Sequence, residues 1–435
     1  KVIFVKYGAP GDVVDLQVDG RKKKFSLAKI TKLHKESELR REPFCEHYGT
    51  CGGCKWQHID YPSQAKLKDT WARDCLTRIG KVEVGETLPI VAAEQLQFYR
   101  NKMEYTFSNK RWLYDNETLE ELEHTNALGF HAPGRFDKVL AINKCWLQDD
   151  KGNDIRNFVY EYCIANDYTF YDLKDHTGLM RNLMLRNTKA GDWMVNVIFA
   201  KKEDDKIERL LKAIQEEFNP KALNYCINEK LNDSTFDQEF ISYSGDFEIQ
   251  EELGGLKFNI SPKSFFQTNP VQAEKLYEVA IDFADIQPTD VVYDLYCGTG
   301  TITCVAATKA KKAVGVEIVE EAIEAAKVNA GINGLTNVEF LAGDMKDVFN
   351  AAFYAEHGKP DIIITDPPRS GMHPKVVDYL AEIAAPKIVY VSCNPATQAR
   401  DLAMLDAKYK IVKSQAVDMF PQTHHAENVV VLVLR

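Results

Sequence analysis

Cys393 is the residue whose place in the sequence is most typical of a chemically active group. It follows the apolar run Lys387–Ser392, which predicts a buried strand, and Asn394-Pro395 ends that strand directly afterwards. Most free cysteines are small buried residues, but a thiol at a strand end can face a bound substrate. Its thiolate can add to an electron-poor carbon and form a covalent intermediate. The position therefore predicts a nucleophile.

A covalent adduct at a ring carbon also needs a base, because a proton must leave before the thiol can. The segment His424-His425-Ala426-Glu427-Asn428 precedes the last apolar run of the chain and offers two kinds of base. Glu427 is the first choice, since a carboxylate in a dry pocket has a raised pKa and suits late proton removal. The histidine pair is the alternative, and polar residues at a strand entrance need no catalytic role.

Strands that alternate with helices are predicted to position these residues. After residue 260, helical patterns such as EEAIEAAKVNAGING separate most of the apolar runs VVYDLYC, KAVGVEI, VEFLAGD, DIIITDPP and KIVYVSC. This alternation is typical of a parallel sheet with helices on both faces. KIVKSQAVD and ENVVVLVLR are expected to add two further strands. Ligands of such sheets bind outside the carboxyl ends of the strands, where the polar residues lie.

The first of these strands leads into a glycine loop, DLYCGTGT, that runs from Asp294 to Thr301 and opens a helix. Glycines there let the backbone approach a ligand, although many turns of this kind carry a glycine pair. The next strand ends in Glu317, where an acid can accept both hydroxyls of a ribose. The following strand ends in Asp344, which is placed to meet an adenine edge. This order predicts an adenosine-containing cofactor, either NAD or S-adenosylmethionine.

Two features favour S-adenosylmethionine. Gly298 and Gly300 are present, but Thr303 occupies the third small position of a dinucleotide fingerprint. Asp294, before the loop, would repel a pyrophosphate but not a cationic sulfonium. The expected fold is therefore α/β, with a C-terminal class I (Rossmann-like) methyltransferase domain.

The fourth strand ends in Asp366-Pro367-Pro368-Arg369. Two prolines after a buried strand stop the hydrogen-bond ladder and fix the turn, and a simple strand terminator would also explain them. Methyltransferases that modify base amines place an aromatic residue after their paired prolines, to stack the target base. Arg369 at that position suggests another chemistry, and a base-amine methyltransferase stays the second hypothesis.

Cys45, Cys51 and Cys54 crowd into the glycine-rich loop CEHYGTCGGCKWQH, which packing alone does not explain. Three thiolates need a fourth ligand. Zinc usually recruits a second close pair, and no other Cys-x-x-Cys occurs. A [4Fe–4S] cluster completed by one distant cysteine is favoured. Cys145, in the strand-like AINKCWLQD, is the candidate fourth ligand.

With SPKSFFQTN, DLYCGTGT, DPPR, SCNP and HHAEN in one order, the chain resembles the RNA uracil-5-methyltransferase family over nearly all of its length. The resemblance implies that Cys393 adds to carbon 6 of a uracil, so that carbon 5 can accept a methyl group. It implies that Glu427 is the base that removes the carbon 5 proton. Phe265 and Phe266 are expected to flank the cofactor or the target nucleobase, although core aromatic residues need no such function. Residues implied to bind the methyl donor are Gln267, Tyr296, Thr301, Glu317, Asp344 and, beside donor and base, Asp366. Relatives often carry Phe at position 296 and Asn at position 301.

The resemblance also suggests which RNA is the substrate. Ribosomal-RNA members of the family carry an N-terminal TRAM-type barrel and a [4Fe–4S] cluster, whereas the bacterial tRNA-directed members usually lack both. This implies 23S ribosomal RNA as the substrate, with tRNA as the alternative. A structural role for the cluster is expected, because methyl transfer from S-adenosylmethionine needs no electrons. The target uridine is expected to lie in a loop and to flip into the pocket.

The composition agrees with a nucleic-acid partner only locally. The chain of 435 residues has a net charge of −10, but residues 1–41 hold eleven Lys or Arg against five Asp or Glu, including the run Arg21–Lys24. A small, RNA-contacting β-barrel is predicted there, with a trimmed start because residue 1 is Lys. The expected domains are this barrel (1–42), a mixed α/β central domain with the cluster loop (43–255) and the methyltransferase domain (256–435).

Several function classes are disfavoured by the sequence. No apolar run of 18 residues occurs, so no membrane partner is expected. Without a secretory segment, the ten cysteines indicate thiols and metal ligands in a cytoplasmic protein rather than disulfides. No obligate protein partner is evident. An iron–sulfur RNA-binding sensor without activity is the third hypothesis, disfavoured by the intact glycine loop.

Overall fold

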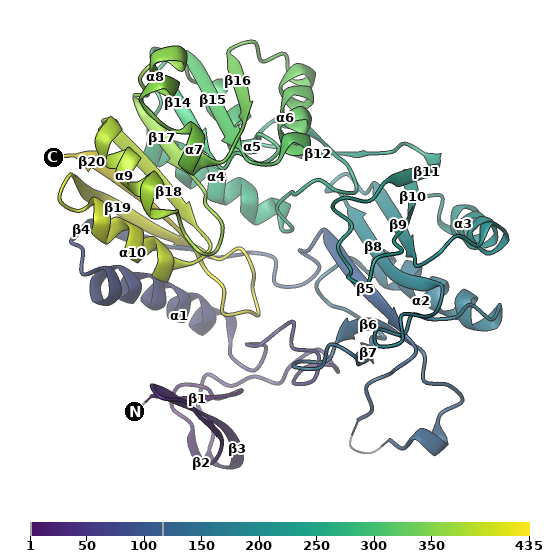
Figure 1. The fold of residues 1–435 in the computed structure, drawn as a ribbon. Helices are drawn as coiled ribbons and strands as arrows, with labels where there is room; N and C mark the ends of the chain where they lie inside the picture. Colours follow the sequence, from purple (N-terminus) through teal and green to yellow (C-terminus); the bar gives the residue numbers. More distant parts are fainter. Residues whose placement is uncertain (1, 115–116) are drawn as a thin grey trace.

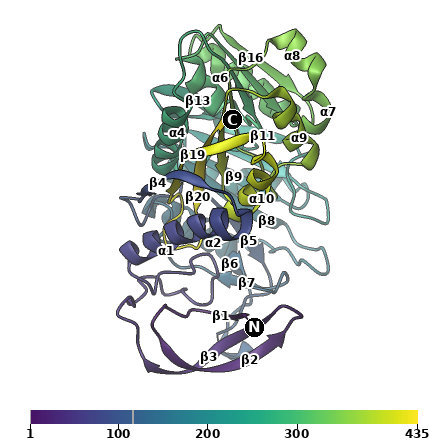
Figure 2. The same ribbon diagram turned by 90° about the vertical axis from the view of Figure 1, so that its left-hand side faces the viewer.

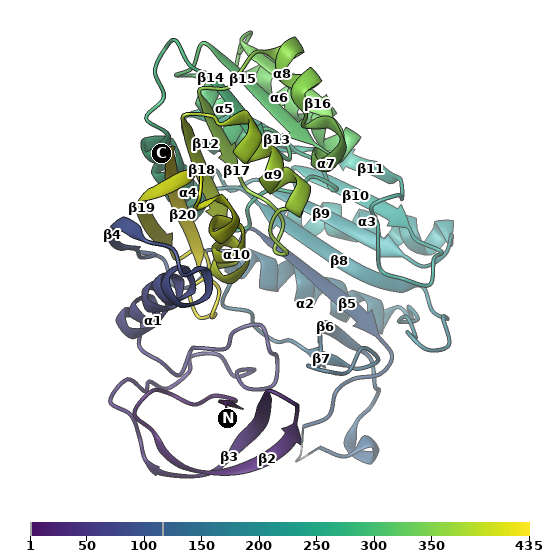
Figure 3. The ribbon, with the colours of Figure 1, turned by 60° about the vertical axis from the view of Figure 1, so that its left-hand side comes forward.

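The fold is built on four β-sheets (Figure 1). The structure, a computed structural model, describes residues 2–114 and 117–435, so Lys1 of the expected barrel lies outside the described residues. Figure 3 shows a small N-terminal sheet at the bottom, a central sheet at the right and the C-terminal sheet above them. This arrangement confirms the predicted α/β class with a small N-terminal β module.

The N-terminal sheet has the strand order β1-β3-β2. Its strands are β1 (Val2–Val5), β2 (Val13–Arg21) and β3 (Phe25–Lys35). Asp19 and Gly20 both belong to β2, and a register shift after Val18 accommodates them. The chain reverses at Lys22–Lys24, whose side chains are all exposed. The basic run therefore forms the tip of a hairpin.

The cysteine-rich loop leads into α1 (Tyr61–Asp74), which continues as the π-helix Cys75–Gly80. The side chain of Asp60 accepts a hydrogen bond from the Ser63 amide and caps the helix. After the helix, β4 (Val84–Val91) pairs in parallel with β19 (Tyr409–Val417), more than three hundred residues later in the chain. Figure 2 shows α1 lying beside this strand. The sequence pattern did not predict β4.

The central sheet has seven strands in the order β11-β10-β9-β8-β5-β6-β7. They are β5 (Lys102–Ser108), β6 (Ala127–His131), β7 (Val139–Ala141), β8 (Met180–Asn187), β9 (Trp193–Phe199), β10 (Ala222–Ile227) and β11 (Phe240–Gly245). Helices α2 (Asp150–Ala165) and α3 (Asp204–Phe218) pack their apolar sides against it. A short 3-10 helix (Leu119–Glu121) precedes β6. The hairpin of β12 (Ile249–Leu253) and β13 (Leu256–Ile260) leads to the C-terminal sheet.

The C-terminal sheet has the order β16-β15-β14-β17-β18-β20-β19-β4. Its remaining strands are β14 (Val291–Leu295), β15 (Lys312–Glu317), β16 (Val338–Ala342), β17 (Ile362–Thr365), β18 (Lys387–Ser392) and β20 (Glu427–Leu434). Strands β14 to β18 are parallel, and β20 is antiparallel to both of its neighbours. All strands predicted after residue 260 are present.

Helices cover both faces of this sheet, as predicted. One face packs against α4 (Pro270–Ala284), α5 (Thr301–Ala307) and α6 (Glu320–Ile332). The other packs against α7 (Met345–Val348), α8 (Ala351–His357), α9 (Pro374–Ile383) and α10 (Pro395–Leu405). Among the described residues, none of the helices is both long and apolar enough to cross a membrane.

Candidate active site

A cavity of 1840 Å³ extends from the cysteine-rich loop to the carboxyl ends of the C-terminal sheet. The sequence-predicted site residues come from segments up to 380 residues apart, yet all of them line this cavity. They are Cys45, Cys51, Cys54, Cys145, Gln267, Tyr296, Thr301, Glu317, Asp344, Asp366, Cys393 and Glu427. The fold therefore brings the candidate metal ligands, cofactor residues and catalytic residues to one connected space.

The glycine loop turns sharply between β14 and α5. Tyr296 (φ 67°), Gly298 (φ 53°) and Gly300 (φ 79°) all have left-handed backbone conformations. A Cβ atom at Gly300 would lie 2.9 Å from both the Ala326 Cβ and the Phe340 ring, so a side chain has no room there. This close packing brings the start of α5 against the sheet and leaves Thr301 at the cavity wall.

The acids at the ends of β15 and β16 are held in defined positions. Glu317 accepts hydrogen bonds from the backbone amides of Gly298 (3.2 Å) and Ile318 (2.8 Å). Asp344 caps α7, and the Lys346 ammonium lies 2.5 Å from its carboxylate and lowers its pKa. Both acids line the cavity, at the ends of two adjacent strands.

Two further acids lie at the carboxyl ends of β14 and β17: Asp366 lines the cavity, and Asp294 is buried before the glycine loop. The buried Asp294 accepts a hydrogen bond from the Thr303 hydroxyl (2.6 Å), and its other carboxyl oxygen has no hydrogen-bond partner among the described residues. Burial raises the pKa of Asp294 to about 7, and the nearby Asp366 adds to the effect. Burial likewise raises the pKa of Asp366 to about 7. Uncompensated acids of this kind fit a cationic ligand, which is the chemistry of a sulfonium methyl donor.

Tyr277 on α4 is a cavity residue that the sequence analysis missed. Its phenol is buried and interacts with the side chains of Gln267 and Thr301. It therefore joins two expected cofactor residues that come from different segments. A tyrosine in an amphipathic helix gives no sequence signal of such a role, because the same pattern describes a core residue.

The pairing of β18 with β20 brings Cys393 and Glu427 together. Ser392 and Asn428 form the last pair of this antiparallel ladder; Cys393 directly follows β18 and Glu427 is the first residue of β20, so the two residues lie at the same end of it. Burial raises the pKa of the Cys393 thiol to about 11, and the charges of Glu427 and Asp366 contribute. Burial also raises the pKa of Glu427 well above its usual value, with a contribution from Asp366.

Arg369 brings a positive charge to this group of acids. Its guanidinium contacts the imidazole Nδ1 of His425 at 3.2 Å, and its charge lowers the pKa of both Cys393 and Glu427. Burial, His424 and Arg369 lower the pKa of His425 to about 4. His425 is thus neutral at pH 7.

The four candidate metal ligands lie at the other end of the cavity. Burial raises the pKa of Cys51 to about 11 and of Cys54 to about 12, and Cys145 contributes to both. Among the described residues, no three His, Cys, Asp or Glu side chains are arranged as they would be around a single metal ion. The prediction that Cys145 belongs to a strand is wrong, because it lies in the loop between β7 and α2. Both Asn153 amide atoms hydrogen-bond to the backbone of Cys145 there.

The strand order, the glycine loop and the acids at the strand ends together define a class I S-adenosylmethionine-dependent methyltransferase. Comparisons with known proteins define the class further. Residues 181–435 match the sequence model of the tRNA (uracil-5-)-methyltransferases. A protein of Bacteroides thetaiotaomicron named as an uncharacterized RNA methyltransferase is 51% identical over 440 residues, which is 100% of this chain and 97% of that protein.

A Chlorobaculum tepidum protein of the same name is 42% identical over 431 residues, covering 97% of this chain and 89% of its own. The structure of Pyrococcus abyssi tRNA (uracil-54, C5)-methyltransferase in complex with S-adenosyl-L-homocysteine matches with a TM-score of 0.76 and 29% identity. The match covers 100% of this chain and 96% of that one. The chain therefore belongs to the RNA uracil-5-methyltransferase family, and it is an S-adenosylmethionine-dependent RNA methyltransferase.

The charge of Arg369 should control the ionisation of Cys393. Arg369→Met removes a positive charge that lowers the thiol pKa, so we expect that pKa to rise above about 11. Each rise of one in pKa reduces the thiolate fraction about tenfold. The measurement is the pH dependence of Cys393 alkylation by iodoacetamide, followed by peptide mass spectrometry. Lys413→Met, which removes an exposed charge on β19, is the control, and an unchanged profile in Arg369→Met would contradict the expectation.

Proposed function

We propose that this enzyme forms 5-methyluridine in RNA through a covalent adduct between Cys393 and carbon 6 of the target uracil. The observation that carries the proposal is that Cys393 and Glu427 lie at the same end of the β18–β20 ladder and line one cavity together with Asp366. A thiol and a carboxylate in adjacent positions are the two groups that this reaction requires. The expected role of the cavity is to hold the methyl donor next to them.

In the proposed reaction, the Cys393 thiolate forms a bond to carbon 6, and the uracil π electrons shift to give an enolate. Carbon 5 of this enolate then bonds to the methyl carbon. When bound, S-adenosylmethionine supplies that methyl group as an electrophile and leaves as S-adenosylhomocysteine. Glu427 next removes the carbon 5 proton, the carbon 5–carbon 6 double bond re-forms, and the thiolate leaves. No external oxidant or reductant is needed.

Six cavity residues are proposed to bind the methyl donor. Glu317 would accept the ribose hydroxyls and Asp344 would meet the adenine, with Tyr296 beside them. Asp366 would lie next to the sulfonium, which its negative charge stabilises. The remaining two, Gln267 and Thr301, are joined through Tyr277.

Glu427 suits the role of base better than the histidines do. Its raised pKa makes the carboxylate a stronger proton acceptor than an exposed one, and burial excludes competing water. The Nδ1 atom of His425 is already in contact with the Arg369 guanidinium, and the low pKa of His425 makes it a weak base. We therefore assign proton removal to Glu427.

The two catalytic residues should block the reaction at different steps. Cys393→Ala should abolish methylation and form no adduct with RNA that contains 5-fluorouridine, whereas the wild-type enzyme should be trapped, because fluorine does not leave as a proton. Glu427→Gln should accumulate adduct even with ordinary RNA. Denaturing gels detect the adduct, and Cys226→Ala, in the central core, is the control. Full activity of Cys393→Ala would overturn the covalent mechanism.

We propose 23S ribosomal RNA as the substrate, with tRNA as the second candidate because the Pyrococcus abyssi enzyme acts on uracil 54 of tRNA. The exposed basic hairpin tip at Lys22–Lys24 supports an RNA-contacting role for a TRAM-like module. The division into residues 1–42, 43–255 and 256–435 belongs to the same proposal, although β4 joins the C-terminal sheet.

Mapping of 5-methyluridine should identify the RNA. Deletion of the gene should remove the modified nucleoside from 23S ribosomal RNA and leave it in tRNA, measured by mass spectrometry of nucleosides from separated RNA fractions. Re-expression of the wild-type enzyme, but not of Cys393→Ala, should restore it. Loss from tRNA alone would replace the proposed substrate with tRNA, and a product methylated on an exocyclic nitrogen would indicate a base-amine methyltransferase.

We further propose that Cys45, Cys51, Cys54 and Cys145 hold a [4Fe–4S] cluster. Their thiols line one end of the cavity and influence one another's pKa, so they are neighbours. A cubane cluster separates its ligand sulfur atoms more widely than a single metal ion does, which fits thiols that do not converge on one ion. The proposed role is to hold this loop in place, and no catalytic step passes through the cluster.

Iron analysis should test the cluster directly. Protein purified without oxygen should contain about four iron and four sulfide per chain, and Cys145→Ser should lose most of both. Cys163→Ser, buried on α2 in the same core, is the matched control and should retain them. The measurements are colorimetric iron and sulfide assays with absorption spectra. Bound zinc, or equal iron in both variants, would contradict the proposal.

A further inference from the structure

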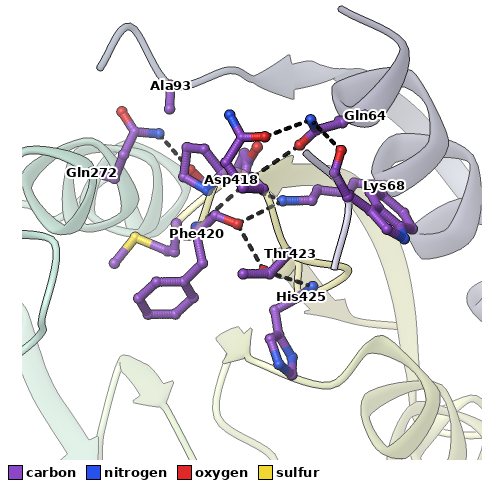
Figure 4. Close-up of polar contacts among 12 residues, drawn as sticks. Gln64, Lys68, Ala93, Gln272, Asp418, Phe420, Thr423 and His425 are labelled. Atoms are coloured by element: carbon purple, nitrogen blue, oxygen red, sulfur yellow. Dashed lines mark hydrogen bonds and ion pairs between the residues drawn. The ribbon is translucent and has the colours of Figure 1, made fainter. Parts of the chain in front are cut away.

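The segment Asp418–Ala426, here called the base loop, connects β19 to β20 and ends directly before Glu427. It has no regular secondary structure, so contacts from other segments must define its conformation. Figure 4 shows that many of these contacts come from α1. This matters for the reaction, because the position of the loop sets the position of the Glu427 carboxylate.

A buried ion pair holds the start of the base loop. The Lys68 ammonium on α1 lies 2.6 Å from the Asp418 carboxylate, and both side chains are 0% exposed. The same ammonium donates to the Phe420 carbonyl oxygen (3.0 Å), and the Tyr61 hydroxyl donates to Asp418 (3.1 Å). A charge without access to water is tolerated only when it is paired, so Lys68 and Asp418 strongly constrain each other.

Hydrogen bonds continue from this ion pair toward Glu427. The Phe420 carbonyl oxygen also accepts from the Thr423 hydroxyl (2.7 Å). The Thr423 oxygen in turn accepts from the backbone amide of His425 (3.2 Å), two residues before Glu427. Figure 4 shows this chain of contacts from Lys68 to His425.

A second set of contacts joins the base loop to the end of the cysteine-rich loop. Gln64 on α1 exchanges two hydrogen bonds of 2.9 Å with Gln422, one to its side-chain oxygen and one from its backbone amide. The backbone amides of Lys55 and Trp56, directly after Cys54, both donate to the Gln422 carbonyl oxygen. Gln422 has a left-handed conformation (φ 67°), which a residue with a side chain adopts only when its surroundings hold it.

We propose that Lys68 and Gln64 are positioning residues that hold the base loop, and through it the Glu427 carboxylate, in place for removal of the carbon 5 proton. This inference rests on the proposed role of Glu427 as the base. Cys393 follows β18 and does not belong to the base loop, so formation of the adduct does not depend on these contacts in the same way. The end of the cysteine-rich loop takes part, because its amides bind the same Gln422 carbonyl.

The test separates the two halves of the reaction. In Lys68→Met, proton removal should slow while adduct formation continues. Methylated adduct should therefore accumulate with ordinary RNA, as is expected for Glu427→Gln. We expect kcat to fall at least about tenfold and the KM for RNA to change less than about twofold. Release of tritium from RNA labelled at carbon 5 of uridine, together with gel analysis of the adduct, measures the two steps separately.

Three further variants keep the test decisive. Lys66→Met changes an exposed lysine on the same helix and should behave as the wild type. Gln64→Leu removes the contacts to Gln422 without leaving an unpaired buried charge, and it decides the question if Lys68→Met does not fold. Thermal melting and S-adenosylmethionine calorimetry establish folding. Replacement of the buried pair by Lys68→Met with Asp418→Leu should also accumulate adduct, because both loop contacts of Lys68 are lost.

The outcomes distinguish this inference from the proposed function. If Glu427→Gln accumulates adduct but folded Lys68→Met and Gln64→Leu release tritium at the wild-type rate, the positioning role is wrong and the role of Glu427 stands. Equal slowing of adduct formation and tritium release, without accumulation, would also overturn it. If Glu427→Gln itself forms no adduct, the assignment of the base fails, and the inference fails with it.

Discussion

The antiparallel pairing of β18 with β20 is the constraint on which the active site depends. Ser392 and Asn428 form the last pair of this ladder, and it places Cys393, directly after β18, near Glu427, the first residue of β20. A slip of one residue would move every side chain of a strand to the other face. Val389 and Val391 on β18 and Val429–Val431 on β20 are buried between helix layers, which makes such a slip costly. The hydrophobic core therefore also determines the catalytic geometry.

Burial also controls the ionisation of the acidic side chains at the carboxyl ends of the C-terminal sheet. Burial raises the pKa of the carboxyl groups of Asp294, Asp366 and Glu427, and the charge of Asp366 adds to the effect on the other two. Grouping acids away from water opposes folding, so the site is stabilised by a cationic ligand that binds only the folded chain. Arg369 partly offsets the negative charge near Cys393 and Glu427. A site of this kind favours a sulfonium donor over a donor that carries phosphates.

Contacts between segments that are far apart in the sequence bring α1 to the base loop and the cysteine-rich loop to the cavity. Strand β4 adds to the edge of the C-terminal sheet, and α1 beside it supplies Lys68, whose ion pair with Asp418 is fully buried. The end of the cysteine-rich loop lies next to the base loop, because the backbone amides of Lys55 and Trp56 donate hydrogen bonds to the Gln422 carbonyl oxygen. The N-terminal half of the chain thus completes a site whose proposed catalytic residues, Cys393 and Glu427, come from the C-terminal half.

Much of the site could be predicted from local sequence, because polar residues after apolar runs mark strand ends. Cys393, Glu317 and Asp344 were placed in this way, and the sheet with helices on both faces was confirmed. Neither Lys68 nor Tyr277 could be found, since a lysine or tyrosine on a helix normally indicates a solvated or core position. Cys145 was assigned to a strand because its neighbours are apolar, whereas the structure buries that apolar run in a loop.

The sequence by itself determined the alternating strands and helices after residue 260, the strand-end motifs and the division of the cysteines into candidate ligands and a candidate nucleophile, because these depend on spacing along the chain. Only the tertiary structure decided that Glu427 lies near Cys393, that Lys68 is paired with Asp418 and that one cavity connects the two groups of cysteines. The physical reason is that strand order, antiparallel register and buried charge pairing arise from long-range packing, which spacing along one chain does not encode.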